Sequence, residues 1–189
     1  MDNAEEDGLL VLARAGDRGA LDRLAQTYRP RLERFAVLMG VGEPEDVAQQ
    51  ALQEGLASLN RFAGRAQLSS WLLGIALNHA RRWLRKAAAK SAPRLGEDLD
   101  RMDHRSPDRS IFSAIVRRED AERVALALDG LPAAYREAFV LHHVEELDFA
   151  EVGRLTGVAE GTARVRAHRA RTLLQEDLGP AFLTLFRRR

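Results

Sequence analysis

Apolar residues recur at intervals of three and four along most of the chain, which is the spacing of one buried face of an α-helix. The first such pattern predicts a helix from Leu9 to about Met39. Its apolar stripe consists of Leu21, Leu24, Tyr28, Leu32 and Phe35. Pro30 lies within the pattern. Because a proline ring removes one helical hydrogen bond, we expect a kink or a helix restart there.

Two more helices are predicted before residue 87. Glycines and a proline between residues 40 and 44 indicate a turn, and the acids Glu45 and Asp46 then suit the positive end of a helix dipole. The apolar positions of this second helix are Val47, Ala51, Leu52, Leu56 and Leu59. A loop around Gly64 precedes a third helix, roughly 68–86, which ends in basic residues. We expect Trp83 on the buried face of that helix, whereas the spacing leaves core and contact roles equally open for Trp71.

The chain changes character between residues 87 and 118. Two prolines, mixed charge and few large apolar residues predict a flexible linker over 87–118. A helical pattern resumes near Ile111, and Pro132 is well placed to open a helix that runs to about Val144. No strand pattern of any length is found. The predicted fold is therefore all-α, with two small helical domains over residues 1–86 and 119–189.

The second predicted domain contains the pattern of a helix-turn-helix. Asp148 and Glu151 have the spacing of a helix-capping box at the start of a short helix over 149–156. Gly157 and the residue after it predict a tight turn, and a longer helix follows from about Glu160 to Leu174. In a helix-turn-helix this second helix enters the major groove of DNA.

The longer helix separates small apolar residues from basic ones. The apolar stripe is Ala163, Ala167, Ala170 and Leu174, and it predicts packing against the domain. One neighbouring face carries Thr162, Arg166 and Arg169, and another carries Arg164, His168 and Arg171. Arginine can bind a guanine edge or a phosphate with two hydrogen bonds. The alternative is a solvated basic face on an ordinary helix, but the capped helix and glycine turn before it favour DNA binding.

Charge and composition narrow the function classes. The 189 residues carry 29 basic and 28 acidic side chains, so the positive charge is local rather than general. There is no cysteine, which excludes disulfides, thiolate metal sites and cysteine nucleophiles. No apolar run approaches the roughly 20 residues of a membrane span, and the acidic start is unlike a signal peptide. We expect a soluble, cytoplasmic protein that does not insert into a membrane.

An enzyme is not predicted. His142, His143, Glu145 and Glu146 invite comparison with a metal site, but adjacent helical residues point about 100° apart and the HExxH spacing is absent. No glycine-rich phosphate loop or nucleophile elbow is found. We therefore predict no catalytic residue, no metal, no cofactor and no small-molecule substrate.

Two stretches together resemble a known family. The run LDGLPAAYREAFVLHHVEELDFAEVGRLTGVAEGTARVRAHRARTLL looks like the promoter-binding C-terminal domain of extracytoplasmic-function (ECF) sigma factors, a subfamily of bacterial sigma-70-type sigma factors. The segments LDRLAQTYRPRLERFA, EPEDVAQQALQEGLASLNRF and WLLGIALNHARRWLRK resemble its promoter-melting domain, in the same order. The resemblance implies a sigma factor that binds core RNA polymerase and directs transcription initiation by recognising −35 and −10 elements, often in stress responses.

The resemblance also implies partners and a docking surface. The positions that match the helix docking on the β′ clamp helices of the polymerase are Glu45, Asp46, Val47, Gln49 and Gln50. The family usually has an acid where this chain has Gln50, so we expect weaker binding to core polymerase. The implied partners are core RNA polymerase (β′ clamp helices and β flap), promoter DNA and an anti-sigma factor.

The implied DNA contacts divide between the domains. The positions matching the −10 contacts are Arg61, Phe62, Leu68, Ser69, Trp71, Asn78, Arg81 and Arg82. The positions matching the −35 contacts are Thr162, Arg164, Arg166, His168, Arg169, Arg171 and His142. His142 stands where some relatives have a phosphate-binding arginine, so that contact is expected to be weaker or pH-dependent. Val165 replaces a small hydroxyl residue common in the family, which puts the base preference in doubt.

Two other functions stay open on the sequence. A stand-alone helix-turn-helix regulator would use the second domain without polymerase. A degenerate sigma paralogue would bind core polymerase without melting promoters, because several docking and melting positions are neutral. Dependence on core polymerase and formation of an open complex separate the three.

Overall fold

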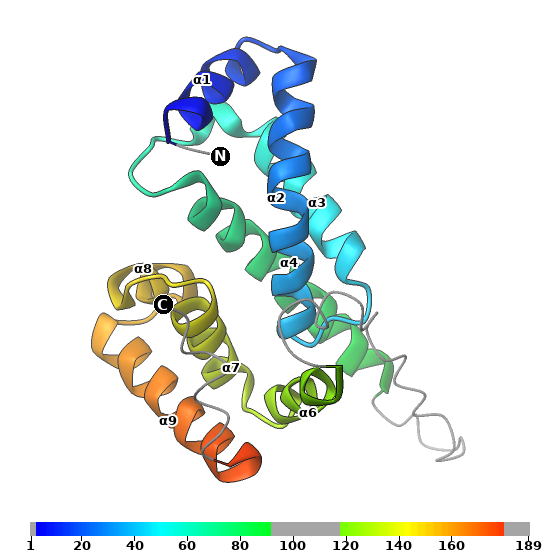
Figure 1. Cartoon of the computed structure of the whole chain (residues 1–189), viewed down its shortest axis with the longest axis vertical. Coiled ribbons are helices and arrows are strands. Elements are labelled where there is room, and N and C mark those ends of the chain that lie inside the picture. The colour runs from blue at the N-terminus through cyan, green and yellow to red at the C-terminus, as the bar shows by residue number, and fades with distance from the viewer. Residues whose placement is uncertain (1–2, 92–117, 180–189) are drawn as a thin grey trace. The chain divides into compact units, whose positions relative to one another are not determined.

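The chain consists of two compact helical units in the computed structural model, which describes residues 3–91 and 118–179 (Figure 1). Unit 1 comprises Met1–Ala36 and Glu43–Met102, and unit 2 comprises Val37–Gly42 and Asp103–Arg189. The described residues form helices and turns and contain no strand. This confirms the all-α prediction. The predicted linker lies mostly outside the described residues, and its flexibility stays a prediction.

Unit 1 begins with two helices where the sequence predicted one. These are α1 (Asn3–Arg14) and α2 (Arg18–Leu38). Gly16 adopts a left-handed φ of 88°, and the Asp17 carboxylate accepts a hydrogen bond from the backbone N–H of Ala20 at 2.7 Å. This side chain satisfies a free donor at the start of α2, so a new helix begins here.

The helix does not restart at Pro30. Pro30 lies inside α2, which continues to Leu38. Its side chain is on the exposed side of the helix, where water can bond to the backbone carbonyl that a proline leaves free. The stripe Leu24, Leu32 and Phe35 is fully buried on the other side, and this packing holds the helix together across the proline.

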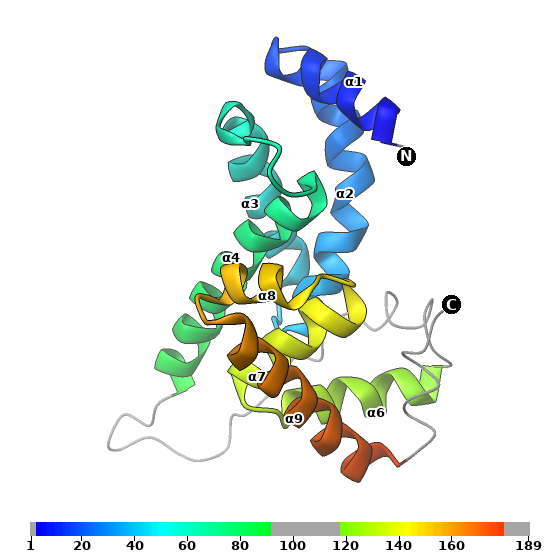
Figure 2. The same ribbon diagram turned by 90° about the vertical axis from the view of Figure 1, so that its left-hand side faces the viewer.

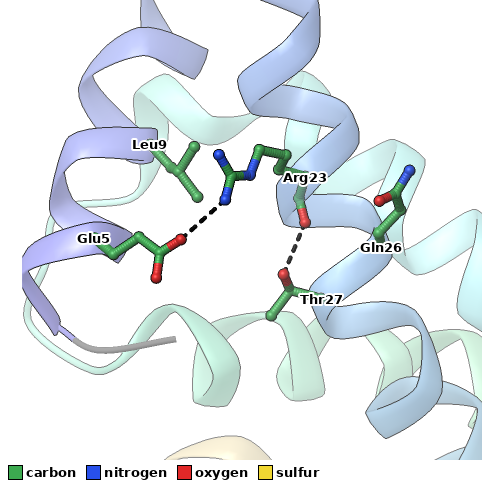
Figure 3. Close-up of a pocket in the computed structure, with 5 residues that line it drawn as sticks. All are labelled: Glu5, Leu9, Arg23, Gln26 and Thr27. Atoms are coloured by element: carbon green, nitrogen blue, oxygen red, sulfur yellow. Dashed lines mark hydrogen bonds and ion pairs between the residues drawn. The ribbon is translucent and has the colours of Figure 1, made fainter.

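Polar contacts connect α1 to α2. The carboxylate of Glu5 pairs with Arg23 at 3.1 Å beside a small pocket that also includes Leu9 (Figure 3). Tyr28 donates a hydrogen bond from its hydroxyl to Glu6. Burial, and then this carboxylate, raise the pKa of the Tyr28 phenol. Because Glu5 and Arg23 are largely exposed, their ion pair contributes at most about 1 kcal/mol.

The core of unit 1 lies against α4. Helix α3 (Pro44–Ala57) packs along α4 (Leu68–Ser91), and a short 3₁₀ helix, Leu59–Arg61, leads from one towards the other (Figures 1 and 2). The fully buried residues of α4 are Leu68, Leu72, Leu73, Ala76, Leu77 and Ala80. Helix α4 is longer than predicted, and residues 87–91, which were assigned to the linker, are helical. The exact domain boundaries stay a prediction.

Unit 2 is a second helical cluster. It contains α6 (Arg118–Asp129), α7 (Ala133–Phe139), α8 (Phe149–Thr156) and α9 (Glu160–Leu178), with both α7 and α8 packed on α9. The helix predicted to reach Val144 is α-helical only to Phe139 and continues as a π-helical turn, Val140–Val144. A wider π-turn alters the direction of the following side chains, and both His142 and His143 lie in it.

Candidate nucleic-acid interface

Helices α8 and α9 form the helix-turn-helix of unit 2. The Asp148 carboxylate accepts a hydrogen bond from the backbone N–H of Glu151 at 2.7 Å, which confirms the predicted cap of α8. Gly157 ends α8 with a left-handed φ of 74°. A Cβ on Gly153 would lie 2.7 Å from the backbone oxygen of Val158, so only glycine allows this close approach. The turn therefore depends on two glycines at fixed positions.

Helix α9 buries one narrow face and exposes the rest. The predicted apolar stripe of Ala163, Ala167, Ala170 and Leu174 is buried, which confirms it. The short alanine side chains let α9 approach α7 and α8 closely. The candidate −35 side chains Thr162, Arg164, His168, Arg169 and Arg171 are exposed, and Arg166 is half-buried. The helix thus presents its basic side chains away from the core.

Arg164 is restrained by two neighbours. Its guanidinium pairs with the Glu160 carboxylate at 2.8 Å, one helical turn earlier. Its Cζ lies over the ring of Phe149 in α8, 4.9 Å from the centroid. A cation over an aromatic face is attracted by about 0.5–1 kcal/mol at an exposed site. Arg164 therefore has a preferred orientation before any ligand binds.

Two histidines extend this contact into the π-helical turn. The His142 ring stacks on Phe149, with the centroids 3.8 Å apart. Its Nδ1 lies 2.8 Å from the carbonyl oxygen of Leu147, which can only accept, so Nδ1 carries a proton and donates it. The neighbouring His143 packs on Phe139 at 4.9 Å, and burial, helped by His142 and Arg171, lowers its pKa to about 4. At neutral pH His143 is an uncharged packing residue.

The candidate docking helix α3 exposes most of its predicted residues. Glu45, Asp46, Gln49 and Gln50 are exposed, whereas Val47 is 2% exposed and belongs to the core. Val47 therefore packs in the core beneath the exposed face of α3. Glu45 and Asp46 lie in the first turn of α3.

A buried histidine of α4 holds two polar side chains of α3. The two ring nitrogens of His79, which is 7% exposed, lie 3.1 Å from Oε1 of Gln50 and 2.8 Å from Oε2 of Glu54. Gln50 and Glu54 are themselves exposed, so His79 fixes part of the outer face of α3 from below. The contact joins the docking helix to α4.

The candidate −10 residues divide between surface and core. Arg61, Asn78 and Arg82 are exposed, and Trp71 and Arg81 are half-buried. Phe62 and Ser69 are nearly buried, and Leu68 is fully buried. The prediction of a DNA contact by Leu68 is not supported by this placement, because a completely buried side chain contacts only its own domain.

Two tryptophans have polar or aromatic neighbours. Trp71 packs on Phe62 with ring centroids 5.3 Å apart, beside the loop that precedes α4. Arg14 of α1 donates a hydrogen bond to the Phe62 carbonyl at 2.6 Å and so fixes the same loop. Trp83, expected in the core, is half-buried, and its indole N–H donates to the Glu43 carboxylate at 3.1 Å. A polar indole N–H commonly has such a partner at the edge of a core.

Comparison with known proteins decides the family. Residues 24–90 match the family described as Sigma-70 region 2, and residues 121–174 match Sigma-70, region 4. The chain is 35% identical over 181 residues to the ECF RNA polymerase sigma factor SigM of Mycobacterium tuberculosis, covering 94% of this chain and 85% of SigM. It is 34% identical over 176 residues to the RNA polymerase sigma factor CarQ of Myxococcus xanthus, covering 92% and 98%.

The chain belongs to the ECF family of sigma-70 factors. As a member of this family, it is a sigma factor that directs promoter-specific transcription. Most residues of the region 2 match belong to unit 1, and the match contains α3 and nearly all of α4. Region 4 contains the helix-turn-helix of unit 2.

A solved structure is similar to the ECF sigma factor over most of its length. It is the sigma factor RpoE in complex with the anti-sigma factor NepR from Bartonella quintana. The two chains align with a TM-score of 0.64 at 23% identity, covering 84% of this chain and 96% of RpoE. At this identity the similarity establishes the fold of the ECF sigma factor.

The described part of the chain contains neither a metal-binding cluster nor a membrane-spanning helix. Over residues 3–91 and 118–179, no group of three or more His, Asp or Glu side chains has a metal-binding arrangement. Within these same ranges, no helix has the length and apolar character required to cross a membrane.

Two site residues of the ECF sigma factor, His79 and Phe149, were not predicted from its sequence. His79 lies on the apolar face of α4, between the buried Ala76 and Ala80, so its position on the helix was a detectable signal. Phe149, the first residue of α8, is half-buried and contacts both His142 and Arg164. The contact with His142 involves the π-helical turn, for which the sequence contained no signal.

Proposed function

We propose that this ECF sigma factor binds core RNA polymerase through α3, reads the −35 element as duplex with α9, and holds the opened −10 strand near the start of α4. Core polymerase supplies the catalysis, in the cytoplasm, and the sigma factor supplies the promoter contacts. The observation that carries this proposal is the exposed basic surface of α9 above a buried alanine stripe. The chain contains both regions of the family, region 2 followed by region 4.

The −35 contact rests on the composition of α9. A recognition helix needs side chains that reach base edges and phosphates from a backbone held close to the groove. Arg166 and Arg169 lie on one side of the outer surface, and Arg164 lies on the other, held by Phe149 and Glu160. Arginines can bind guanine edges through two hydrogen bonds, each good pair contributing about 1–3 kcal/mol of discrimination.

The −10 contact rests on exposed groups around the loop before α4. Single strands are held by aromatic surfaces and cationic grooves. Trp71 and Phe62 supply an aromatic pair, and Arg61 and Arg82 supply exposed positive charge. Asn78 is exposed on α4, where its amide can hydrogen-bond to an unstacked base. Phe62 is 8% exposed, so it would stack on a base only after the loop before α4 moves.

The docking contact rests on exposed acids at the start of α3. Glu45 and Asp46 provide a negative surface, and complementary charge speeds docking on a basic coiled coil such as the β′ clamp helices. We also propose an anti-sigma factor as a partner. This is supported by the structural similarity to RpoE, which was solved with the anti-sigma factor NepR.

Reconstituted transcription tests the function. Core polymerase from a related bacterium is mixed with the full chain and a pool of upstream regions, and transcript 5′ ends are mapped. The proposal predicts new starts that share −35 and −10 elements and disappear when the chain is omitted. Core binding without new starts would contradict promoter melting and identify a degenerate paralogue. DNA binding that persists without any core binding would instead identify a stand-alone regulator.

A further inference from the structure

One outward-facing position of α9 is apolar. Val165 is 53% exposed, although it lies between Arg164 and Arg166 on a helix whose other exposed residues near it are polar or glycine. Successive helical residues are about 100° apart, which places Val165 nearly opposite the buried stripe of Ala163, Ala167, Ala170 and Leu174. The valine therefore points away from the core of unit 2.

The neighbours of Val165 on this face are the residues three and four positions away. These are Gly161, Thr162, His168 and Arg169, and all four are exposed. Gly161 carries no side chain, and a Cβ added to it would have no heavy atom within 4 Å. The valine methyls are consequently accessible from outside, with Arg169 and His168 at their border.

Folding does not explain a valine at this position. Its exposed half gains little from burial within the domain, and valine has a lower helix propensity than alanine. A partner that covers these methyls would recover the lost burial, at about 0.8 kcal/mol per methyl-sized group. In the major groove, the apolar group that a base pair presents is the C5-methyl of thymine.

We propose that Val165 is a specificity-determining residue that contacts the C5-methyl of a thymine in the −35 element. This rests on the proposed function, because it requires α9 to occupy the major groove. The basic residues on either side hold the duplex backbone and bases. Val165 then favours a thymine at the base pair that it faces. It disfavours a cytosine at the same position, because cytosine lacks the C5-methyl.

Replacing thymine with uracil tests the contact, because the two bases differ only by this methyl. The holoenzyme of core polymerase and full-length chain is titrated with promoter duplexes in which each −35 thymine is changed to deoxyuridine, one at a time. For the unchanged chain we expect the Kd to rise about fourfold when one particular thymine is replaced. This factor corresponds to about 0.8 kcal/mol. In V165A the same substitution should have no effect.

The controls separate a contact from a general defect. V165A keeps the helix, because alanine is the better helix former and the site is exposed. L173A truncates the other exposed large apolar residue described on α9 and should retain the fourfold sensitivity to deoxyuridine. Equal sensitivity in V165A and the unchanged chain would overturn the inference, as would no sensitivity at any thymine. If unmodified promoter DNA is not bound specifically, the proposed function fails first, and the inference fails with it.

Discussion

The two units expose their candidate contacts to different degrees. In unit 2 the candidate −35 side chains of α9 are exposed or half-buried, over a stripe that is completely buried. In unit 1 the candidate −10 residues range from exposed Asn78 to fully buried Leu68. A duplex groove is read by side chains that project from a rigid helix, whereas a single strand needs aromatic surfaces that a folded domain partly covers. A larger share of the candidate residues is therefore accessible in the −35 set than in the −10 set.

Truncating Leu68, the fully buried residue among the candidate −10 contacts, should have the largest effect on stability. Leu68→Ala removes a fully buried side chain and should lower the free energy of unfolding by about 2–5 kcal/mol. The matched control is Leu126→Ala on α6, where the side chain is 71% exposed and the expected change is under about 0.5 kcal/mol. Urea unfolding of the full chain, followed by circular dichroism, measures both. Unchanged stability with weaker promoter opening would restore Leu68 as a DNA contact.

Removing an exposed arginine of unit 2 should affect binding instead of stability. Arg169→Ala should weaken promoter binding by the holoenzyme about 5- to 150-fold, which corresponds to the roughly 1–3 kcal/mol of a base-reading arginine. Arg23→Ala in unit 1 is the control, because Arg23 is exposed and pairs with Glu5 on α1. Kd values are measured at one fixed salt concentration. A loss of equal size on all sequences would mean that Arg169 binds phosphate only.

Capping distinguishes α8 of unit 2 from α3 of unit 1. Asp148→Ala should lower the free energy of unfolding by about 1 kcal/mol, because it removes the acceptor for the Glu151 N–H. Asp148→Asn keeps a hydrogen-bond acceptor at this position and should retain most of the free energy of unfolding of the unchanged chain. Helix α3 has no such cap, since the Glu43 side chain bonds to no N–H at the start of that helix. Equal stability of Asp148→Ala and the unchanged chain in thermal or urea unfolding would show that the turn does not depend on the cap.

Acid should destabilise unit 2 through His143. Its pKa falls to about 4 in the folded state from an ordinary value near 6.5, so the folded state favours the neutral ring. The contribution to stability is complete above about pH 6.5 and is lost as the pH falls towards 4. We expect a loss of about 1 kcal/mol between pH 7.5 and 5, because partial exposure reduces the effect. NMR titration of the His143 ring measures the pKa, and a midpoint near 6.5 would contradict its burial.

The smallest effect is expected for Gln50→Glu. The added carboxylate supplies the acid usual in the family and should improve the affinity for core polymerase, by no more than about fivefold for one exposed charge. The Kd for core polymerase is compared between Gln50→Glu and the unchanged chain. Equal Kd values would show that the departure at Gln50 does not weaken docking.

The sequence predicted the helix-turn-helix almost to the residue, because caps, glycine turns and alanine spacing are local signals. The bounds of α8, the Asp148 cap and the buried stripe of α9 all agree with the prediction. The break between α1 and α2 was missed, since it depends on Asp17 acting as a cap inside a continuous apolar pattern. The continuity at Pro30 depends on long-range packing. Likewise, the contacts of His79 with Gln50 and Glu54 depend on how α3 packs on α4, although the position of His79 on the apolar face of α4 was a detectable signal.

We propose that this single chain both reads the −35 element and opens the −10 element. Promoter opening is the most direct test of this proposal. Permanganate oxidises unpaired thymines, so it is applied to a mapped promoter bound by core polymerase and the full chain. With the unchanged chain we expect reactive thymines in the −10 region. In the double variant Asn78→Ala and Arg82→Ala this reactivity should be lost, while binding at the −35 element persists. If the complex forms with the unchanged chain but every thymine stays unreactive, the chain binds promoters without melting them. That result would contradict the proposed opening of the −10 element.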